Sequence, residues 1–276
     1  MKVLLKSLAF LVFLTFSACL DDEFLLVEHT TPFSYKSITV TETTDGGLGA
    51  GLVNHSDTYS FGTNQRLLYH LFTQQFVAEE SPTLQHETTL AYTDKTVTVT
   101  DAFGHSSVYT LDVHGYATAC TRTEGSGFVR HYAFRYAANP SGGISFTGLT
   151  ETINQTVTAE LELKSVTPTQ SLLTVHNGEF AYTYHLVAAE TNVHHLPWLY
   201  LTELYPLNLH ADALYAHLLG EAPSLLLQTI TPEGNQQNEQ TTYTYTHDER
   251  GYLTSCTETL RTDGVNYPRI LTYVLK

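Results

Sequence analysis

Histidine is the residue type in this sequence that most invites a chemical role. The chain has 14 histidines, and the densest group along it consists of His194, His195, His210 and His217. A catalytic zinc site needs about three ligands on a rigid frame, often with the spacing of the H-E-x-x-H motif. His86-Glu87 is followed by Thr-Thr-Leu, and His210 and His217 are two helical turns apart, so neither supplies that geometry. We therefore predict no metal site and place these histidines at a surface or an interface.

Nucleophilic and acid–base motifs are also missing from the sequence. It contains no G-x-S-x-G turn of the kind that presents a catalytic serine. Cys120 and Cys256 lie inside strand-like runs, where a cysteine is a small core residue rather than a nucleophile. Glycoside hydrolysis needs two carboxylates across a cleft, whereas Glu160 and Glu162 share the wet face of one strand. We expect no catalytic residue and no cofactor, although carboxylates that converge only in the fold are not excluded.

The overall composition limits the possible partners. The formal net charge is −15, so the chain lacks the basic surface that binds nucleic acid. Charged residues make up only 15% of the sequence, against about 25% in a typical globular protein. Threonine and tyrosine take up the difference, and both favour β-strands.

The first residues predict the compartment. Lys2 and Lys6 precede a short apolar run, and Phe16-Ser17-Ala18-Cys19 resembles a bacterial lipobox. We predict a signal peptide over 1–18 and lipid attachment, palmitate included, at Cys19. A plain secretory signal followed by a chance cysteine is the alternative interpretation.

An acidic tether follows the cysteine, over 19–32. Asp21, Asp22 and Glu23 resemble the export signal of surface lipoproteins in Bacteroides-type bacteria, although three acids would also simply keep a tether solvated. We expect an outer-membrane lipoprotein exposed at the cell surface, or otherwise facing the periplasm. Its membrane contact would then be the lipid on Cys19.

The remainder, 33–276, reads as a single β domain. Apolar and polar residues alternate over Thr156–Lys164, which is typical of a strand in an antiparallel sheet with one wet face. Asp101, Asp112 and Asp248 each precede a glycine by three residues between strand-like runs, and this spacing predicts hairpin turns.

An internal repeat links two distant hairpins. The segment 108–123 matches 244–259 at nine of sixteen positions, and Cys120 and Cys256 occupy the same place in the two copies. Equivalent places in separate hairpins favour cysteines that lie apart, although a curved sheet could still bring them together in a disulfide.

One segment, near 196–220, breaks the strand pattern. It is rich in Leu, Ala and Tyr, and residues 210–219 suggest a helix with Asn208 as its N-cap and Gly220 as its stop. The fold class is therefore mainly β, a large curved antiparallel sheet or partly open barrel built from hairpins, with a short helical insertion.

The Asp-x-x-Gly-Tyr-x-Thr-x-Cys-Thr hairpins, the helical stretch 215–220 and the lipobox together resemble a known family. This is the Bacteroides-type lipoprotein family of domain of unknown function 4595, described as having a porin-like fold. The resemblance covers roughly 83–276 and implies a curved sheet approaching a barrel. It implies no activity.

The abundant tyrosines are the remaining clue to function. On an open sheet face they could stack on sugar rings, and in a curved sheet they could instead fill the core. Our leading hypothesis is a non-enzymatic binding or scaffold protein that engages a glycan or an apolar molecule in a sheet cavity. The alternative is a glycan-directed hydrolase. A purely structural surface component, with a filled interior, is the third possibility.

Overall fold

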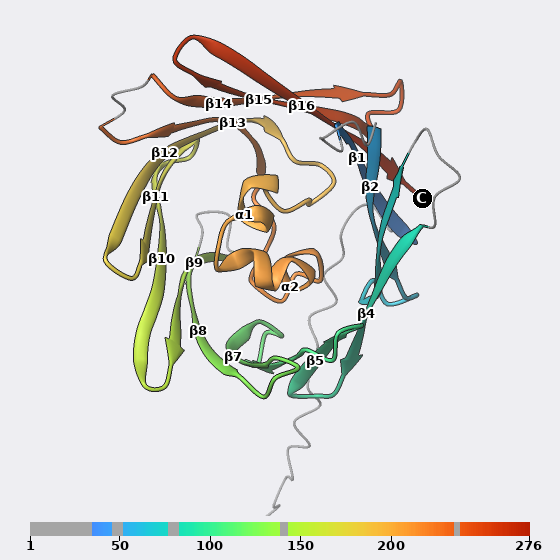
Figure 1. Ribbon diagram of the computed structural model, residues 1–276, viewed down its shortest axis with the longest axis vertical. Coiled ribbons are helices and arrows are strands. Elements are labelled where there is room, and N and C mark those ends of the chain that lie inside the picture. The colour runs from blue at the N-terminus through green and yellow to red at the C-terminus, as the bar shows by residue number, and fades with distance from the viewer. Residues whose placement is uncertain (1–34, 46–51, 77–82, 139–142, 235–237) are drawn as a thin grey trace, which may run out of the picture.

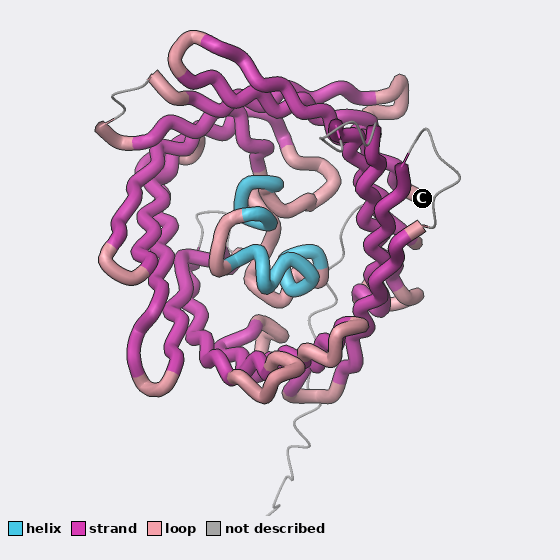
Figure 2. The backbone as a smooth tube through the Cα atoms, viewed as in Figure 1, coloured by secondary structure: helices cyan, strands magenta, loops and turns pink. Residues whose placement is uncertain are grey.

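The strands form a closed, sixteen-stranded antiparallel barrel (Figures 1 and 2). The computed structural model describes residues 35–45, 52–76, 83–138, 143–234 and 238–276. The strands are β1 Ser37–Asp45, β2 Leu52–Phe61, β3 Leu67–Phe76, β4 Leu84–Tyr92, β5 Thr96–Asp101, β6 Ser106–Leu111, β7 Ala117–Thr123, β8 Val129–Ala138, β9 Ile144–Ile153, β10 Thr156–Thr167, β11 Gln170–Asn177, β12 Phe180–Thr191, β13 Leu225–Pro232, β14 Gln240–His247, β15 Leu253–Thr262 and β16 Val265–Leu275.

The expectation of a partly open barrel is wrong, because the first and last strands close the ring. β1 pairs with β16 from Ile38↔Leu275 to Glu42↔Leu271. An open sheet would leave two edges with unpaired backbone groups, and closure removes both. The predicted antiparallel, hairpin-built architecture is confirmed.

The side chains of the wall alternate between the lumen and the exterior, and the buried apolar residues face the lumen. On β10, Ala159 and Leu161 are buried, whereas Glu160, Glu162 and Lys164 lie on the outer face and are partly or fully exposed. Hydroxyl groups pair across strands on the outer wall, as in Thr39 with Thr58 at 3.1 Å. No helix within the described ranges is long and apolar enough to cross a membrane.

The predicted Asp-x-x-Gly turns are present and share one hydrogen-bond pattern. Oδ1 of Asp112 accepts the backbone N–H groups of His114 and Tyr116 at 2.8 and 2.9 Å. Gly115 has φ +85°, a conformation that glycine adopts without strain. Asp248 accepts two backbone N–H groups in the same way.

The internal repeat corresponds to two equivalent hairpins on opposite walls. Tyr109 pairs with Cys120 between β6 and β7, and Tyr245 pairs with Cys256 between β14 and β15. Six strands separate the two hairpins in either direction around the barrel. Both cysteines are buried and free, so the disulfide left open by the sequence is not formed.

The link between β12 and β13, residues 192–224, passes through the lumen and is called the plug below (Figures 1 and 2). It contains α1 Leu199–Glu203, the 3-10 turn η1 Leu207–His210 and α2 Ala211–Tyr215. The predicted helical insertion is therefore present, but the predicted helix over 210–219 with a cap at Asn208 is wrong. α2 ends at Tyr215, since His217 has φ +55° and cannot continue a helix.

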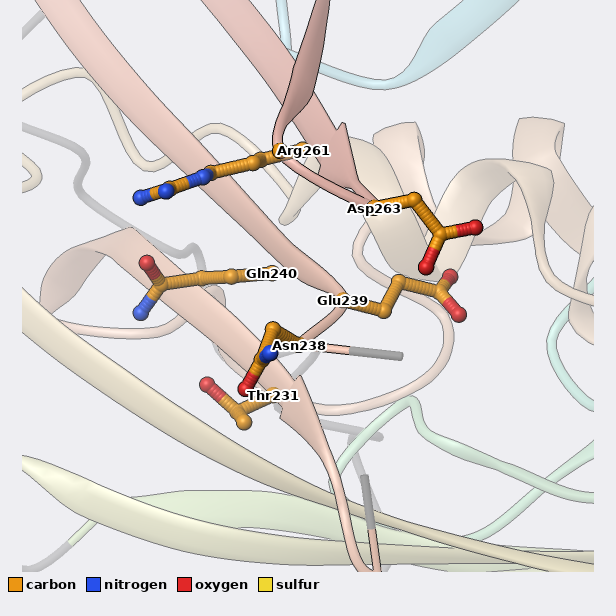
Figure 3. Close-up of a pocket in the computed structure, with 7 residues that line it drawn as sticks. Thr231, Asn238, Glu239, Gln240, Arg261 and Asp263 are labelled. Atoms are coloured by element: carbon orange, nitrogen blue, oxygen red, sulfur yellow. The ribbon is translucent and has the colours of Figure 1, made fainter. Parts of the chain in front are cut away.

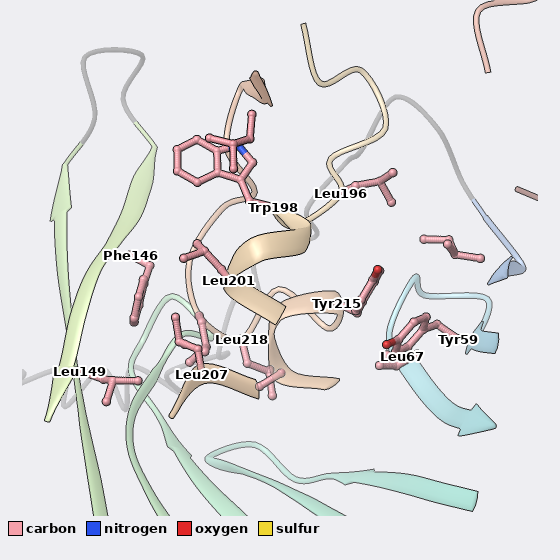
Figure 4. Close-up of a cluster of buried hydrophobic side chains, with 14 of the residues drawn as sticks. Tyr59, Leu67, Phe146, Leu149, Leu196, Trp198, Leu201, Leu207, Tyr215 and Leu218 are labelled. Atoms are coloured by element: carbon pink, nitrogen blue, oxygen red, sulfur yellow. The ribbon is translucent and has the colours of Figure 1, made fainter. Parts of the chain in front are cut away.

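The plug completes the hydrophobic core. Figure 4 shows Trp198, Leu201 and Leu207 of the plug between β9 on one side and β2 and β3 on the other. Each of these residues is at most 8% exposed. Such short helices are marginal in isolation, so packing against the wall must stabilise them.

The two rims of the barrel differ. The plug enters at the rim that carries the β6–β7 and β14–β15 turns, which we call the plug rim. The opposite rim carries the β5–β6, β11–β12 and β15–β16 turns, among others, and we call it the mouth. Tyr35, the first described residue, contacts His194 at the plug rim.

Candidate functional site

Three groups on the plug contact charged groups on the wall, and together they form the floor of the mouth. Asp212 of α2 contacts His70 of β3. Tyr205 contacts Glu151 of β9, and Glu203 of α1 contacts Arg269 of β16. These contacts determine how far the plug fills the lumen toward the mouth.

The His70 contact is a partly buried ion triplet. Nδ1 of His70 lies 2.8 Å from Oδ1 of Asp212, and Nε2 lies 2.9 Å from Oδ1 of Asp57 on β2. The imidazole stacks on Tyr59, which in turn stacks on Tyr215 of α2. Burial lowers the pKa of His70, but the two carboxylates outweigh it and raise the pKa to about 9. His70 is therefore charged at neutral pH.

The second contact surrounds a fully buried carboxylate. Glu151 is 0% exposed, and its Oε1 lies 2.9 Å from Nη1 of Arg130 on β8. The Tyr205 hydroxyl donates to Oε2 of Glu151 at 2.8 Å, and Thr158 donates to Oε1. Burial and the adjacent carboxylate raise the pKa of Tyr205 to about 12. A buried carboxylate with this many partners fixes the position of the plug.

The third contact gathers three carboxylates around Arg269. Its Nη2 lies 2.8 Å from Glu203 and 2.6 Å from Glu258, and Nη1 lies 3.7 Å from Glu42. Burial raises the pKa of Glu203, and Arg269 opposes that effect. Adjacent carboxylates with a raised pKa are suited to acid–base chemistry. Here both oxygens of Glu203 accept from Arg269, while those of Glu258 are bound by Arg269 and Tyr243.

Above this floor, a row of rings crosses one side of the mouth. We call it the mouth row, and it consists of His55, Phe72, His86, Phe103 and His105. Successive ring centroids lie 6.2, 5.9, 4.5 and 5.9 Å apart. The strand alternation puts His55 on the same inward face as Tyr59, and Phe72 on that of His70. Phe103 is 60% exposed, and the other four rings are partly exposed.

The far side of the mouth also carries aromatic rings. Phe180 and Tyr182 alternate with inward Leu186 on β12, and they are 66% and 50% exposed. Their ring centroids lie 6.5 Å apart, with planes 16° from parallel. The inward face of β12 is thus buried beside the plug and exposed at the mouth.

A polar cavity opens at the mouth where β13 and β14 separate. Within the described ranges these strands pair at only two positions, Thr229↔Thr242 and Ile230↔Thr241. The cavity has a volume of about 680 Å³ and is lined by Thr231, Asn238, Glu239, Gln240, Arg261, Asp263 and Gly264. Figure 3 shows Arg261 and Gln240 extending to one side, and Glu239 and Asp263 to the other. Its lining offers hydrogen bonds rather than apolar contact.

Two of the histidines singled out in the sequence are not at a surface. His194 is 5% exposed and accepts the backbone N–H of Leu253 at 3.0 Å, and His210 is 1% exposed and hydrogen-bonded to Tyr109. Burial lowers the pKa of His210 to about 3, so it is a neutral core residue. The prediction that these histidines lie at a surface is wrong, because both belong to the plug and the plug lies inside the lumen. Across the described ranges no group of three His, Cys, Asp or Glu side chains is placed to hold a metal ion.

The cysteines and the tethering residues have different outcomes. Cys120 and Cys256 are buried core residues as predicted, and burial raises the pKa of each thiol to about 12. Cys19, Asp21, Asp22 and Glu23 lie outside the described residues, so their roles stay predictions. The mouth row was not predictable from the sequence, because its members come from four separate elements. Single His or Phe residues at inward positions were the only signal.

The fold and its contents define a closed antiparallel barrel whose lumen is filled by its own polypeptide. The chain belongs to the family described as domain of unknown function (DUF4595) with porin-like fold, whose model matches residues 62–255.

Two solved structures show the same architecture. A porin-like protein from Bacteroides uniformis superposes with a TM-score of 0.82 at 28% identity, covering 89% of this chain and 97% of that one. A porin-like protein from Bacteroides vulgatus has a TM-score of 0.51 at 8% identity, covering 86% and 96%, and supports the fold alone. No curated protein matches this sequence.

Proposed function

We propose that this protein is a lipid-anchored, non-enzymatic binding protein of the cell envelope, with its ligand site at the mouth of a plugged barrel. The ligand is a glycan or an apolar small molecule. Envelope association is supported by the family and by the Bacteroides protein of the same architecture. The lipobox supports anchoring at Cys19, and Asp21, Asp22 and Glu23 support export to the cell surface.

The observation that carries this proposal is the contrast between the floor and the mouth. Below the floor, the lumen is filled by apolar side chains, and in the floor itself the charged groups bind one another. Above it, seven aromatic or imidazole rings on two sides of the barrel remain partly or largely exposed. Exposed rings that could have packed in a core are typical of interaction sites.

The position of Tyr35 supports an orientation of the barrel in which the mouth points away from the membrane. The chain enters the barrel at the plug rim, where Tyr35 contacts His194 and hydrogen-bonds to the β2–β3 turn through Gln65. A tether leading from this rim to a lipid on Cys19 would turn the mouth away from the membrane. A ligand outside the cell could then reach the exposed rings directly.

The test is a binding screen of neutral oligosaccharides, fatty acids and sterols against the chain lacking residues 1–20. Binding by either class that is weakened in Phe103→Ala would support the mouth as the site. Binding by neither class would refute the proposal and favour a structural surface component.

For the anchor, Cys19→Ser should abolish labelling of the full chain by a clickable palmitate analogue in the native host, and unchanged labelling would refute lipidation at Cys19.

The arrangement around Arg269 favours a second candidate, a glycan-directed hydrolase. Glu203 and Glu258 are brought together at one guanidinium, and the pKa of Glu203 is raised. If they form an acid–base pair, release of reducing ends from an oligosaccharide should be lost in both Glu203→Gln and Glu258→Gln. Because every carboxylate oxygen of this pair is already bound by Arg269 or Tyr243, we place this candidate second.

A further inference from the structure

We infer that the mouth row is a binding platform for neutral oligosaccharides. This inference rests on the proposed function and selects one of its two ligand classes. Imidazole and phenyl rings alternate along the row, in the order His55, Phe72, His86, Phe103 and His105. A purely apolar ligand would favour phenyl and aliphatic side chains alone.

Polar groups lie between the rings on the same inward faces. Asp57 shares the face of His55 on β2, Gln74 that of Phe72 on β3, and Thr88 that of His86 on β4. At the end of the row, Oδ2 of Asp101 lies 2.7 Å from Nδ1 of His105. Rings beside carboxylate, amide and hydroxyl groups match a sugar, which presents apolar C–H faces and hydroxyl edges together.

The extent of the row favours a chain of sugars over a single one. Its five rings are contributed by β2, β3, β4 and the β5–β6 turn. Phe72 and His86 are directly opposite in the antiparallel register, so the row runs across the strands rather than along one of them. A linear ligand of several residues could contact successive rings.

Charge selects neutral over acidic sugars. The carboxylates of Asp57 and Asp101 stand within the row, and the nearest cationic groups are already paired with them: His70 with Asp57, and Arg122 at 3.8 Å from Asp101. Among the described residues of this region, His70 and Arg122 are thus already paired with carboxylates, which disfavours binding of a uronic acid or a sulfate. The chain as a whole carries −15 and repels anionic polymers.

Titration calorimetry on the chain lacking residues 1–20 tests the inference with five probes. These are maltohexaose, cellohexaose and mannohexaose, with a galacturonic acid hexamer as the acidic comparison, and lauric acid is the apolar control. At least one neutral hexamer should bind, and it should bind more tightly than the acidic hexamer. Phe103→Ala should weaken that binding about 2- to 12-fold, the range expected for loss of one ring contact.

Val113→Ala is the matched control, because Val113 is 68% exposed on the β6–β7 turn at the plug rim. Equal affinities in Phe103→Ala and Val113→Ala would overturn the mouth row as the glycan site. Binding of lauric acid alone, weakened in Phe103→Ala, would overturn this inference and leave the proposed function intact. Tighter binding of the acidic hexamer would overturn the charge argument and with it the ligand class. Binding of no probe would overturn both.

Discussion

The ion triplet at His70 makes a quantitative prediction about stability. Replacing His70 by Gln removes a cation that lies between Asp57 and Asp212 and is only 15% exposed. The pKa of His70 is raised from 6.5 to about 9. Since each tenfold change in proton affinity is worth about 1.4 kcal/mol, the charged form contributes about 3 kcal/mol to folding.

The sign of the pH dependence follows from the direction of that shift. Because the folded-state pKa is the higher one, the contribution is complete below pH 6.5 and is lost as the pH rises through about 9. His70→Gln should therefore lower the free energy of unfolding by about 3 kcal/mol at pH 6. The difference from the unaltered chain should shrink toward zero by pH 10.

Urea denaturation, followed by Trp198 fluorescence and far-UV circular dichroism, measures this difference across the pH range. Trp198 is the only tryptophan and is buried in the plug, so its emission reports on unfolding of the plug. His114→Gln, at an exposed turn position, controls for loss of an imidazole as such. A destabilisation by His70→Gln that stays constant from pH 6 to pH 10 would refute the reasoning.

Three further predictions concern the turns, the plug and the thiols. Asp248→Ala removes the acceptor of two backbone N–H groups, so it should lower the urea midpoint of unfolding, and an unchanged midpoint would contradict this. Gly220→Ala should lower the free energy of unfolding by more than about 1 kcal/mol in thermal unfolding, because Gly220 has φ +89° and a Cβ there would lie 3.0 Å from the backbone nitrogen of Phe146. Gly178 also has a positive φ but has open space around it, so Gly178→Ala should be less destabilising. Cys120 and Cys256 should resist a thiol reagent such as DTNB at pH 8 until urea unfolds the barrel, because both are buried with pKa values near 12, and rapid labelling of the folded protein would disprove this.

Local features of the fold were predictable because they depend on short-range chemistry. The alternation over Thr156–Lys164 and the Asp-x-x-Gly turns each involve neighbouring residues, and the structure confirms both. Closure of the barrel was not predictable, since it depends on accumulated twist and register that bring β1 to β16, more than two hundred residues apart in sequence.

The floor and the mouth row were missed for the same physical reason. Glu203, Glu258 and Arg269 lie on a helix and two strands, and nothing in their sequence neighbourhoods links them. Likewise, the sequence indicated a helix near 210 but not that it would enter the lumen. Because the plug lies in the lumen, His210 is buried. The inward face of β12 extends beyond the plug, and Phe180 on that face is therefore exposed.

The pairing of β1 with β16 has a consequence for how the molecule is made. While a chain emerges from its N-terminus, β1 lacks its second neighbour until Leu271–Leu275 have been synthesised. Throughout that time both β1 and the newest strand offer unpaired backbone groups to other chains. A nascent molecule therefore has two unpaired strand edges, both prone to aggregation, until β16 has been synthesised. A chain truncated before β16 would keep two such edges permanently.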